Sequence, residues 1–344
     1  MIAIAPAPRK PQRLELLATL VTGWFNPGDA PTLVTNECGR HSATYCRGFR
    51  VAVTAAAIEW RALRPADVPG AFNLSRIAGW NQTEADWLGY LAFDPAGCSA
   101  AVIDGQLAGT ATSIRFGEGI GWIGMILVHP AHRRIGVGSG LLKRTIQYLR
   151  DRGTRGIRLD ATAAGRKVYL PLGFRDEYDV TRLEGSAPIV RSGPVSAAPP
   201  GVAGQMSHGD LAQIVELDTQ AFGSDRSSVL TELSGRNPGL CFVVRNPEGI
   251  SGYLIAREGR EAIQLGPFVA RCPSTAGQLL DSLFRAAPGR RMFLDVPAPN
   301  REAGELLAAH GFTPQRQFTR MILGESGPAD HIGLVFGTSG AEKG

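Results

Sequence analysis

WIGMILVHPAHRRIGVGSGLLKRTIQY, residues Trp122 to Tyr148, is the stretch that decides how this chain folds. A largely apolar run ends at His129-Pro130, two arginines and three alternating glycines follow, and an amphipathic pattern closes the stretch. The apolar run indicates a buried strand and the closing pattern indicates a helix. A glycine-rich turn between a strand and a helix N-terminus is a common pyrophosphate site, because the first helical N–H groups have no partner in the helix.

The bulk composition limits the classes of function. At 344 residues the chain has room for two ordinary domains. It has 44% hydrophobic and 19% charged residues and lacks a long apolar run, so no membrane span is expected. The net charge of +5 suits an anionic ligand, but the basic residues are too dispersed to predict nucleic-acid binding. Five scattered cysteines without a C-x-x-C pair predict neither disulfides nor a metal site. The start lacks the ordered regions of a signal peptide, which favours a cytoplasmic protein.

Five segments follow from pattern and composition. Residues 1–55 show no sustained period and predict a partly disordered N-terminal extension. Residues 56–185 alternate strand and helix patterns, and residues 186–204 are a linker rich in Pro, Gly and Ala. Residues 205–325 resemble the first domain, and residues 326–344 are left as a C-terminal tail.

Local signals place individual elements in the first domain. Arg64-Pro65 predicts the start of a helix that ends near Ile77. Thr83 followed by Asp86 predicts a capping box, and Asp104-Gly105 predicts a type I′ hairpin. Gly153 is placed to end the helix that follows the glycine turn.

The second half repeats the first at an offset of 138 residues. The matching features are an apolar helix stripe, a Gly-Phe turn and a strand triplet: Leu141, Leu142 and Ile146 with Leu279, Leu280 and Phe284; Gly173-Phe174 with Gly311-Phe312; Thr181–Leu183 with Thr319–Met321. RLDATA and FLDVPA also correspond, with a shift of three residues. We therefore predict an α/β protein with two copies of one fold, each a mixed twisted sheet flanked by helices.

At the glycine turn the chain resembles the GCN5-related N-acetyltransferase (GNAT) family, whose signature [Q/R]-x-x-G-x-[G/A] is matched by Arg133-x-x-Gly136-x-Gly138. Neither a Walker loop nor a dinucleotide fingerprint fits the spacing. The resemblance covers roughly residues 58–185, and the tandem arrangement resembles a bacterial two-domain branch of the family. It implies direct attack of a primary amine on the acetyl-CoA thioester in a ternary complex, through a tetrahedral intermediate and without an acyl-enzyme.

The same resemblance assigns residues to roles. The turn and the splayed central strand would hold acetyl-CoA through Leu127, Val128, Arg133, Arg134, Gly136, Val137, Gly138, Ser139 and Gly140. Tyr169 stands where the family places a tyrosine that protonates the departing thiolate, and its counterpart Leu307 cannot do so. Histone-type members carry a glutamate where this chain has Trp122, so the base is open among Glu118, Asp160 and a water relay. His129 fits a structural role better.

The acceptor side is less constrained. Trp80, Asn81, Asp86 and Trp87 lie in the region that covers the acceptor pocket in this family, although packing of a short helix explains them equally well. In the second copy Ser274 replaces the first glycine and Pro273 removes an N–H, so Arg271–Ala276 should not bind coenzyme. Asp225-Arg226 and Asp295 remain available for the acceptor pocket or a domain interface.

The sequence thus predicts an acetyl-CoA-dependent N-acetyltransferase, without metal, that acts on a small-molecule amine as a monomer or homodimer. A protein-lysine acetyltransferase and a non-catalytic acyl-CoA sensor or scaffold are the alternatives. The identity of the amine does not follow from the sequence.

Overall fold

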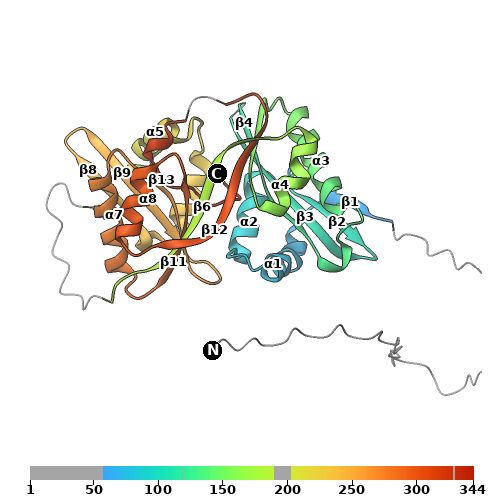
Figure 1. Cartoon of the computed structure of the whole chain (residues 1–344), viewed down its shortest axis with the longest axis horizontal. Helices are drawn as coiled ribbons and strands as arrows, with labels where there is room; N and C mark the ends of the chain where they lie inside the picture. The colour runs from blue at the N-terminus through green and yellow to red at the C-terminus, as the bar shows by residue number, and fades with distance from the viewer. Residues whose placement is uncertain (1–56, 118, 190–202, 328–329) are drawn as a thin grey trace, which may run out of the picture. The chain divides into compact units, whose positions relative to one another are not determined.

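The computed structural model describes residues 57–117, 119–189, 203–327 and 330–344, which form two halves with the same order of elements (Figure 1). The first half contains β1 (Glu59–Ala62), α1 (Val68–Ile77), α2 (Glu84–Phe93), β2 (Ser99–Ile103), β3 (Gln106–Phe116), β4 (Ile120–Val128), α3 (Val137–Asp151), β5 (Gly156–Ala161), α4 (Ala163–Tyr169) and β6 (Arg175–Ser186). The second half contains β7 (Gly204–Gln205), α5 (Leu211–Phe222), α6 (Ser227–Arg236), β8 (Cys241–Asn246), β9 (Gly249–Arg257), β10 (Ile263–Ala270), α7 (Pro273–Ala286), β11 (Arg291–Pro297), α8 (Arg301–Ala309), β12 (Thr313–Gly324) and β13 (Val335–Gly337). Within these ranges no helix combines the length and the apolar character that a bilayer crossing needs.

The local signals of the sequence appear in the first half as predicted. Helix α1 ends at Ile77, and α2 begins with a capping box in which the Thr83 N–H donates to Asp86 at 2.8 Å. Asp104 and Gly105 both have positive φ, 49° and 75°, as a type I′ turn between β2 and β3 requires. These elements form because each is specified by residues close together in the sequence.

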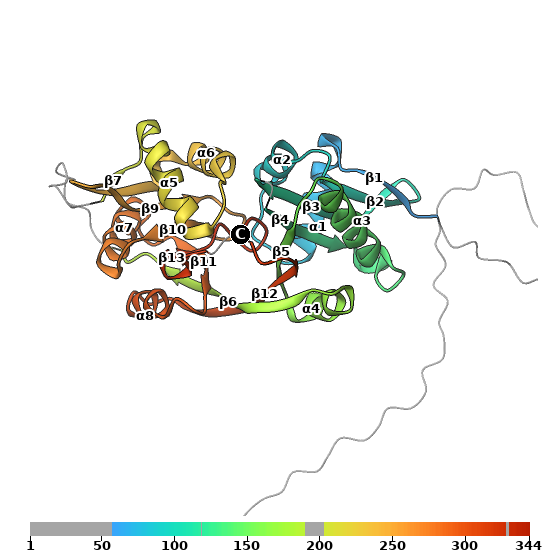
Figure 2. The same ribbon diagram turned by 90° about the horizontal axis from the view of Figure 1, so that it is seen from above.

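The strands of the described residues join into one sheet, in the order β1-β2-β3-β4-β5-β12-β6-β11-β10-β9-β8-β7, with β13 beside β10. The two halves therefore exchange their last long strands: β12 lies between β5 and β6, and β6 lies between β12 and β11 (Figure 2). Val180 of β6 faces Phe318 of β12, and these residues are 138 positions apart, which is the offset of the repeat. The exchange is thus centred on an approximate two-fold axis. The α/β class and the duplication are confirmed, whereas the exchange was not predicted.

Strands β4 and β5 pair only at one end. Their parallel register covers Ile120–Trp122 and Gly156–Arg158, and the strands separate beyond these residues. A register shift between β3 and β4 accompanies the separation, and Met125 adopts a φ of 48° within it. This bulge turns the second part of β4 away from β5 and leaves one edge of it without a neighbouring strand.

The equivalent strands of the second half, β10 and β11, also pair only at Ile263–Leu265 and Met292–Leu294. Here the gap is filled, because β13 pairs with β10 at Phe268 and Val269. The described residues after 325, expected only as a tail, therefore include strand β13 and a buried last turn that complete the second half. The first half keeps its gap open.

Candidate functional site

The glycine turn joins the end of β4 to α3. Arg134 and Gly136 have left-handed backbone conformations, with φ of 65° and 92°, and Gly136 caps the helix. The first helical hydrogen bond runs from the Gly140 N–H to the Gly136 carbonyl at 2.9 Å. The amides of the three residues in between, 137–139, consequently have no acceptor within the helix. Together with the helix dipole they form a site that suits an anionic group.

The predicted coenzyme residues of the turn have different roles in the structure. The Arg133 Nε donates to the Val128 carbonyl at 3.2 Å, which holds this side chain at the end of β4. A Cβ at Gly138 would lie 3.4 Å from Val128, an ordinary contact. A Cβ at Gly140 would lie 2.3 Å from the Trp60 ring. Gly140 is therefore needed for the packing of α3 against β1.

A cavity of about 480 Å³ opens where β4 and β5 separate. Its walls contain several of the predicted residues: Trp80, Leu127, Val128, Arg133, Gly138, Asp160 and Tyr169. The exchanged strand β12 contributes Arg316 and Phe318, and the last residues of the sequence contribute Ala341 and Glu342. The cavity is thus built by the first half and closed by residues of the second.

Tyr169 lies at the end of α4, half-buried, with its ring centroid 5.9 Å from that of Phe174. The ring also rests on Gly165, where a Cβ would lie 3.0 Å from it. Burial raises the pKa of Tyr169 to about 12. The Tyr169 phenol therefore stays protonated at neutral pH. It is available there as a hydrogen-bond donor at the cavity wall.

The structure describes only one of the two carboxylates that were expected as catalytic bases. Glu118 lies outside the described residues. Both oxygens of Asp160 accept hydrogen bonds from the buried Arg320, at 2.8 and 2.9 Å. Burial raises the pKa of Asp160, and the charge of Arg320 opposes this effect. Because both oxygens are engaged with Arg320, the geometry favours a role for Asp160 in holding β12 against β5.

A second ion pair repeats this arrangement across the two-fold axis. Arg182 of β6 donates to both oxygens of Asp295 on β11, at 2.7 and 2.8 Å. Arg182 and Arg320 are equivalent positions at the repeat offset, and Asp160 and Asp295 stand in the corresponding sequences RLDATA and FLDVPA. Asp295 therefore lies at the interface between the halves. This is one of the two locations, acceptor pocket or domain interface, that the sequence allowed for it.

Of the four residues expected near the acceptor, only Trp80 lines the cavity. Asn81 binds the second half: its amide donates to the Ala262 carbonyl at 3.0 Å and its oxygen accepts from two backbone N–H groups. Trp87 is fully buried and donates to Ser75 at 3.1 Å. For Asn81 and Trp87 the structural explanation is therefore the better one.

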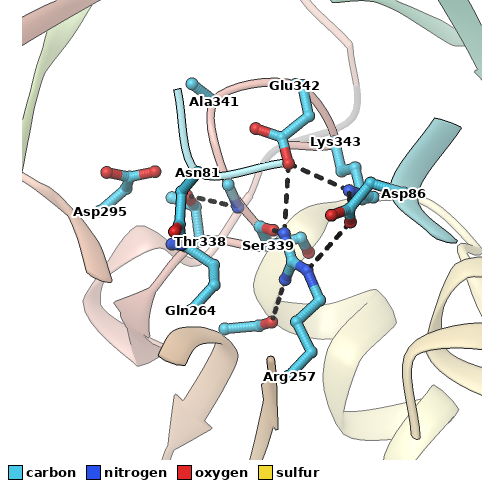
Figure 3. A network of polar contacts seen from close by, with 12 residues as sticks. Asn81, Asp86, Arg257, Gln264, Asp295, Thr338, Ser339, Ala341, Glu342 and Lys343 are labelled. Atoms are coloured by element: carbon cyan, nitrogen blue, oxygen red, sulfur yellow. Dashed lines mark hydrogen bonds and ion pairs between the residues drawn. The ribbon is translucent and has the colours of Figure 1, made fainter. Parts of the chain in front are cut away.

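Asp86 also faces inward, toward a buried cluster of charges (Figure 3). It accepts from Arg236 at 2.7 Å and from Lys343 at 3.2 Å, and Arg257 lies 3.3 Å away. Burial raises the pKa of Asp86, but these three cations outweigh burial and bring that pKa well below its usual range. Glu342 accepts from Arg257 and Lys343 at 3.1 and 3.0 Å, which ties the last residues of the sequence to the cluster.

Asp225 and Arg226 do not line the cavity. Asp225 accepts from the Ser227 N–H at 2.7 Å at the start of α6. Arg226 is buried, donates to both oxygens of Asp218, and donates to the Gly344 carbonyl at 2.9 Å. It therefore anchors the last residues of the sequence from the second half.

The degenerate turn of the second half adjoins a filled gap. Cys272 caps α7 and Pro273 occupies its first position, so one helix-terminal N–H is missing. Phe336 of β13 is completely buried in the core of this half, and the Thr338 N–H donates to the Asp295 carbonyl at 2.9 Å. Leu307, the counterpart of Tyr169, is also completely buried. Strand β13 thus lies, in the second half, where the first half has its open gap.

Several cavity residues were missed from the sequence, among them Gln82, Arg316 and Glu342. Gln82 directly follows Trp80 and Asn81, so its position beside the predicted acceptor residues could have indicated it. Arg316 and Glu342 reach the cavity only through the strand exchange and the buried last turn, for which no local pattern exists.

Comparisons with known proteins agree with this architecture. Residues 61–174 match the model of the acetyltransferase (GNAT) family, and residues 214–337 match that of an acetyltransferase (GNAT) domain. The uncharacterized N-acetyltransferase YitH of Bacillus subtilis is 25% identical over 246 residues, 71% of this chain and 84% of that protein. A mycothiol acetyltransferase of Kineococcus radiotolerans is 29% identical over 232 residues, 61% of this chain and 76% of that protein. A structure from Pyrococcus horikoshii assigned to the acetyltransferases shares the fold, with a TM-score of 0.70, 24% identity, and coverage of 89% and 99% of the two chains.

Proposed function

Since this chain belongs to the acetyltransferase (GNAT) family, with one GNAT domain in each half, we propose that it transfers the acetyl group of acetyl-CoA directly to a primary amine of a small molecule. The observation that carries the proposal is the contrast between the two gaps. The gap between β4 and β5 opens into a cavity that extends from the glycine turn to Tyr169, whereas β13 fills the equivalent gap of the second half. The first half is the catalytic one.

The residues of the first half fit the coenzyme. The amides at the start of α3 and the guanidinium of Arg133 bind the diphosphate. Leu127 and Val128 pair with β3 on one edge only, so their other edge offers backbone groups to the pantetheine arm. The coenzyme supplies an activated thioester, and the Tyr169 hydroxyl supplies a proton to the leaving sulfur.

A small acceptor is favoured over a protein by the way in which the cavity is closed. Ala341 and Glu342 form a wall that is anchored by buried ion pairs, and a peptide would need an open groove at that place. The likeness to a mycothiol acetyltransferase supports an acceptor of low molecular weight.

The test is coenzyme A release over a panel of small amines, together with calorimetry of acetyl-CoA binding. The Gly136→Asp variant places a carboxylate where the diphosphate binds and should abolish both signals. Gly105→Asp is the matched control, since Gly105 also has positive φ and open space around its Cβ, but lies in the β2–β3 turn. Binding of acetyl-CoA by Gly136→Asp with unchanged affinity, or two coenzyme sites per chain, would refute the proposal.

A further inference from the structure

The cavity has two ends that differ in chemistry. One end adjoins the glycine turn, where Gly138 faces Val128. The other adjoins Glu342, whose backbone would lie 2.8 Å from a Cβ at Gly124. Gly124 and Val128 are four residues apart on β4, so the ends are separated by about 13 Å at 3.3 Å per residue. With the coenzyme diphosphate at the turn, the Glu342 end is left for the acceptor.

Arg316 is a cation at this cavity that has no carboxylate partner among the described residues. It lies directly opposite Arg182 in the pairing of β12 with β6. Arg182 is neutralised by Asp295, whereas Arg316 is not. Burial lowers the pKa of Arg316 and the charge of Arg182 lowers it further, while the more weakly acting charges of Asp295 and Glu261 oppose the shift without pairing with Arg316 in the described residues. Like charges opposite one another on neighbouring strands are unfavourable, so an anion beside Arg316 would remove a cost present in the protein alone.

Hydrogen-bond acceptors line the cavity as well. Gln82 is only 7% exposed, and its Oε1 has no hydrogen-bond partner in the part of the chain that the structure describes. The Oε1 of Glu342 accepts from Arg257 and Lys343, while no hydrogen bond to its Oε2 is found among the described residues. A buried acceptor without a partner, such as the Gln82 Oε1, is costly, and an ammonium group supplies N–H donors for it and for the Oε2 of Glu342.

We infer that the acceptor is a primary amine that also carries one carboxylate, with its ammonium group at Gln82 and Glu342 and its carboxylate paired with Arg316. One unpaired arginine matches one negative charge, which favours a carboxylate over a phosphate ester. This inference rests on the proposed function and names the substrate class of the same site. Glu342 binds the ammonium group of the acceptor, and Arg316 selects for acceptors that carry a carboxylate.

The first experiment compares matched acceptors: glycine, β-alanine and 4-aminobutyrate against their carboxamides, with O-phosphoethanolamine as the phosphate arm. At least one carboxylate should show a KM about tenfold or more below that of its carboxamide, as expected for one charge-assisted pair. Arg316→Ala should remove this preference and Arg316→Lys should retain part of it. Arg301→Ala, an exposed arginine outside the cavity, should leave the preference unchanged. Equal KM values for each acid and its amide, or a preference for the phosphate ester, overturn the inference.

The second experiment does not depend on turnover. Calorimetry of the same acids and amides, with the wild-type protein and Arg316→Ala in the absence of acetyl-CoA, should show tighter binding of an acid that requires Arg316. If acids and amides bind alike while acetyl-CoA binds normally, this inference fails and the proposed function stands. If acetyl-CoA does not bind but an acid binds through Arg316, the proposed function fails and the carboxylate site stands.

Discussion

Replacement of Lys343 by methionine should strongly destabilise the protein. The side chain is completely buried, and its Nζ donates to Asp86 at 3.2 Å, to Tyr90 at 3.0 Å and to Glu342 at 3.0 Å. Methionine matches the length of lysine but leaves two buried carboxylates with one cation fewer. Removal of one partner of a buried ion pair costs about 3–5 kcal/mol, and we expect a loss of that size in the free energy of unfolding at pH 7.

The pH dependence of this loss follows from Glu342. Burial raises the pKa of Glu342, but Lys343 and Arg257 outweigh burial and lower that pKa from 4.5 to about 2. A depressed folded-state pKa adds stability above pH 4.5, and this stability disappears as the pH falls toward 2. At 1.36 kcal/mol per pKa unit the contribution is about 3 kcal/mol. Lys343→Met removes a cation beside Glu342 and so raises the pKa of Glu342. The difference in free energy of unfolding between the wild type and Lys343→Met should therefore shrink as the pH is lowered through this window.

Urea unfolding between pH 7 and pH 3 measures both effects, with Lys167→Met as the control at an exposed lysine. Because Glu342→Gln removes one of the two stranded carboxylates, the double variant Glu342→Gln/Lys343→Met should lose less stability than the sum of the single variants. A Lys343→Met protein within about 1 kcal/mol of the wild type at pH 7 would contradict the expected cost of the broken pair. Strict additivity of the double variant would contradict the pairing itself.

Three further variants test the roles proposed for the first half. Tyr169→Phe should lower kcat about 10²–10⁴-fold at constant thermal stability. Burial raises the pKa of Tyr169 to about 12, so the wild type should show no loss of turnover from tyrosine ionisation between pH 6 and pH 10. Full turnover of Tyr169→Phe over that range would rule out the acid role. Gly140→Ala should cost about 1–3 kcal/mol in thermal unfolding through its clash with Trp60. Gly138→Ala should instead weaken acetyl-CoA binding at unchanged stability. Loss of stability in Gly138→Ala together with weakened acetyl-CoA binding in Gly140→Ala would contradict both assignments.

Features that depend on neighbours in the sequence were predictable. Thr83 and Asp86 cap α2, and Asp104-Gly105 forms the hairpin turn, because turn and capping chemistry acts over two to four residues. The duplication was also visible, since both copies keep their apolar positions at one offset. The glycine turn was found for the same reason: strand, glycines and helix follow one another directly.

Features that depend on partners far apart were not predictable. Lys343 has no apolar or periodic context, and two of its three hydrogen-bond partners, Asp86 and Tyr90, lie 257 and 253 positions away in the sequence. Asp160 looked like a free carboxylate because its partner Arg320 is 160 positions away on the other copy. The pairing of β6 with β12 depends on the complementarity of two similar strands, and hydrophobic periodicity does not say which copy a strand will join.

The strand exchange gives the copy without the glycine signature a structural role in the cavity of the first half. If each half kept its own last strand, Arg320 would face Asp295 and Arg182 would face Asp160, and the cavity would lack Arg316. The exchange instead gives the first half a β12 that carries Arg316 and Phe318 into the cavity, held there by the buried pair of Arg320 with Asp160. The second half is thus free to lose its coenzyme turn and to fill its own gap with β13. It is not free to lose β12 or the buried last turn, because both form walls of the cavity in the first half.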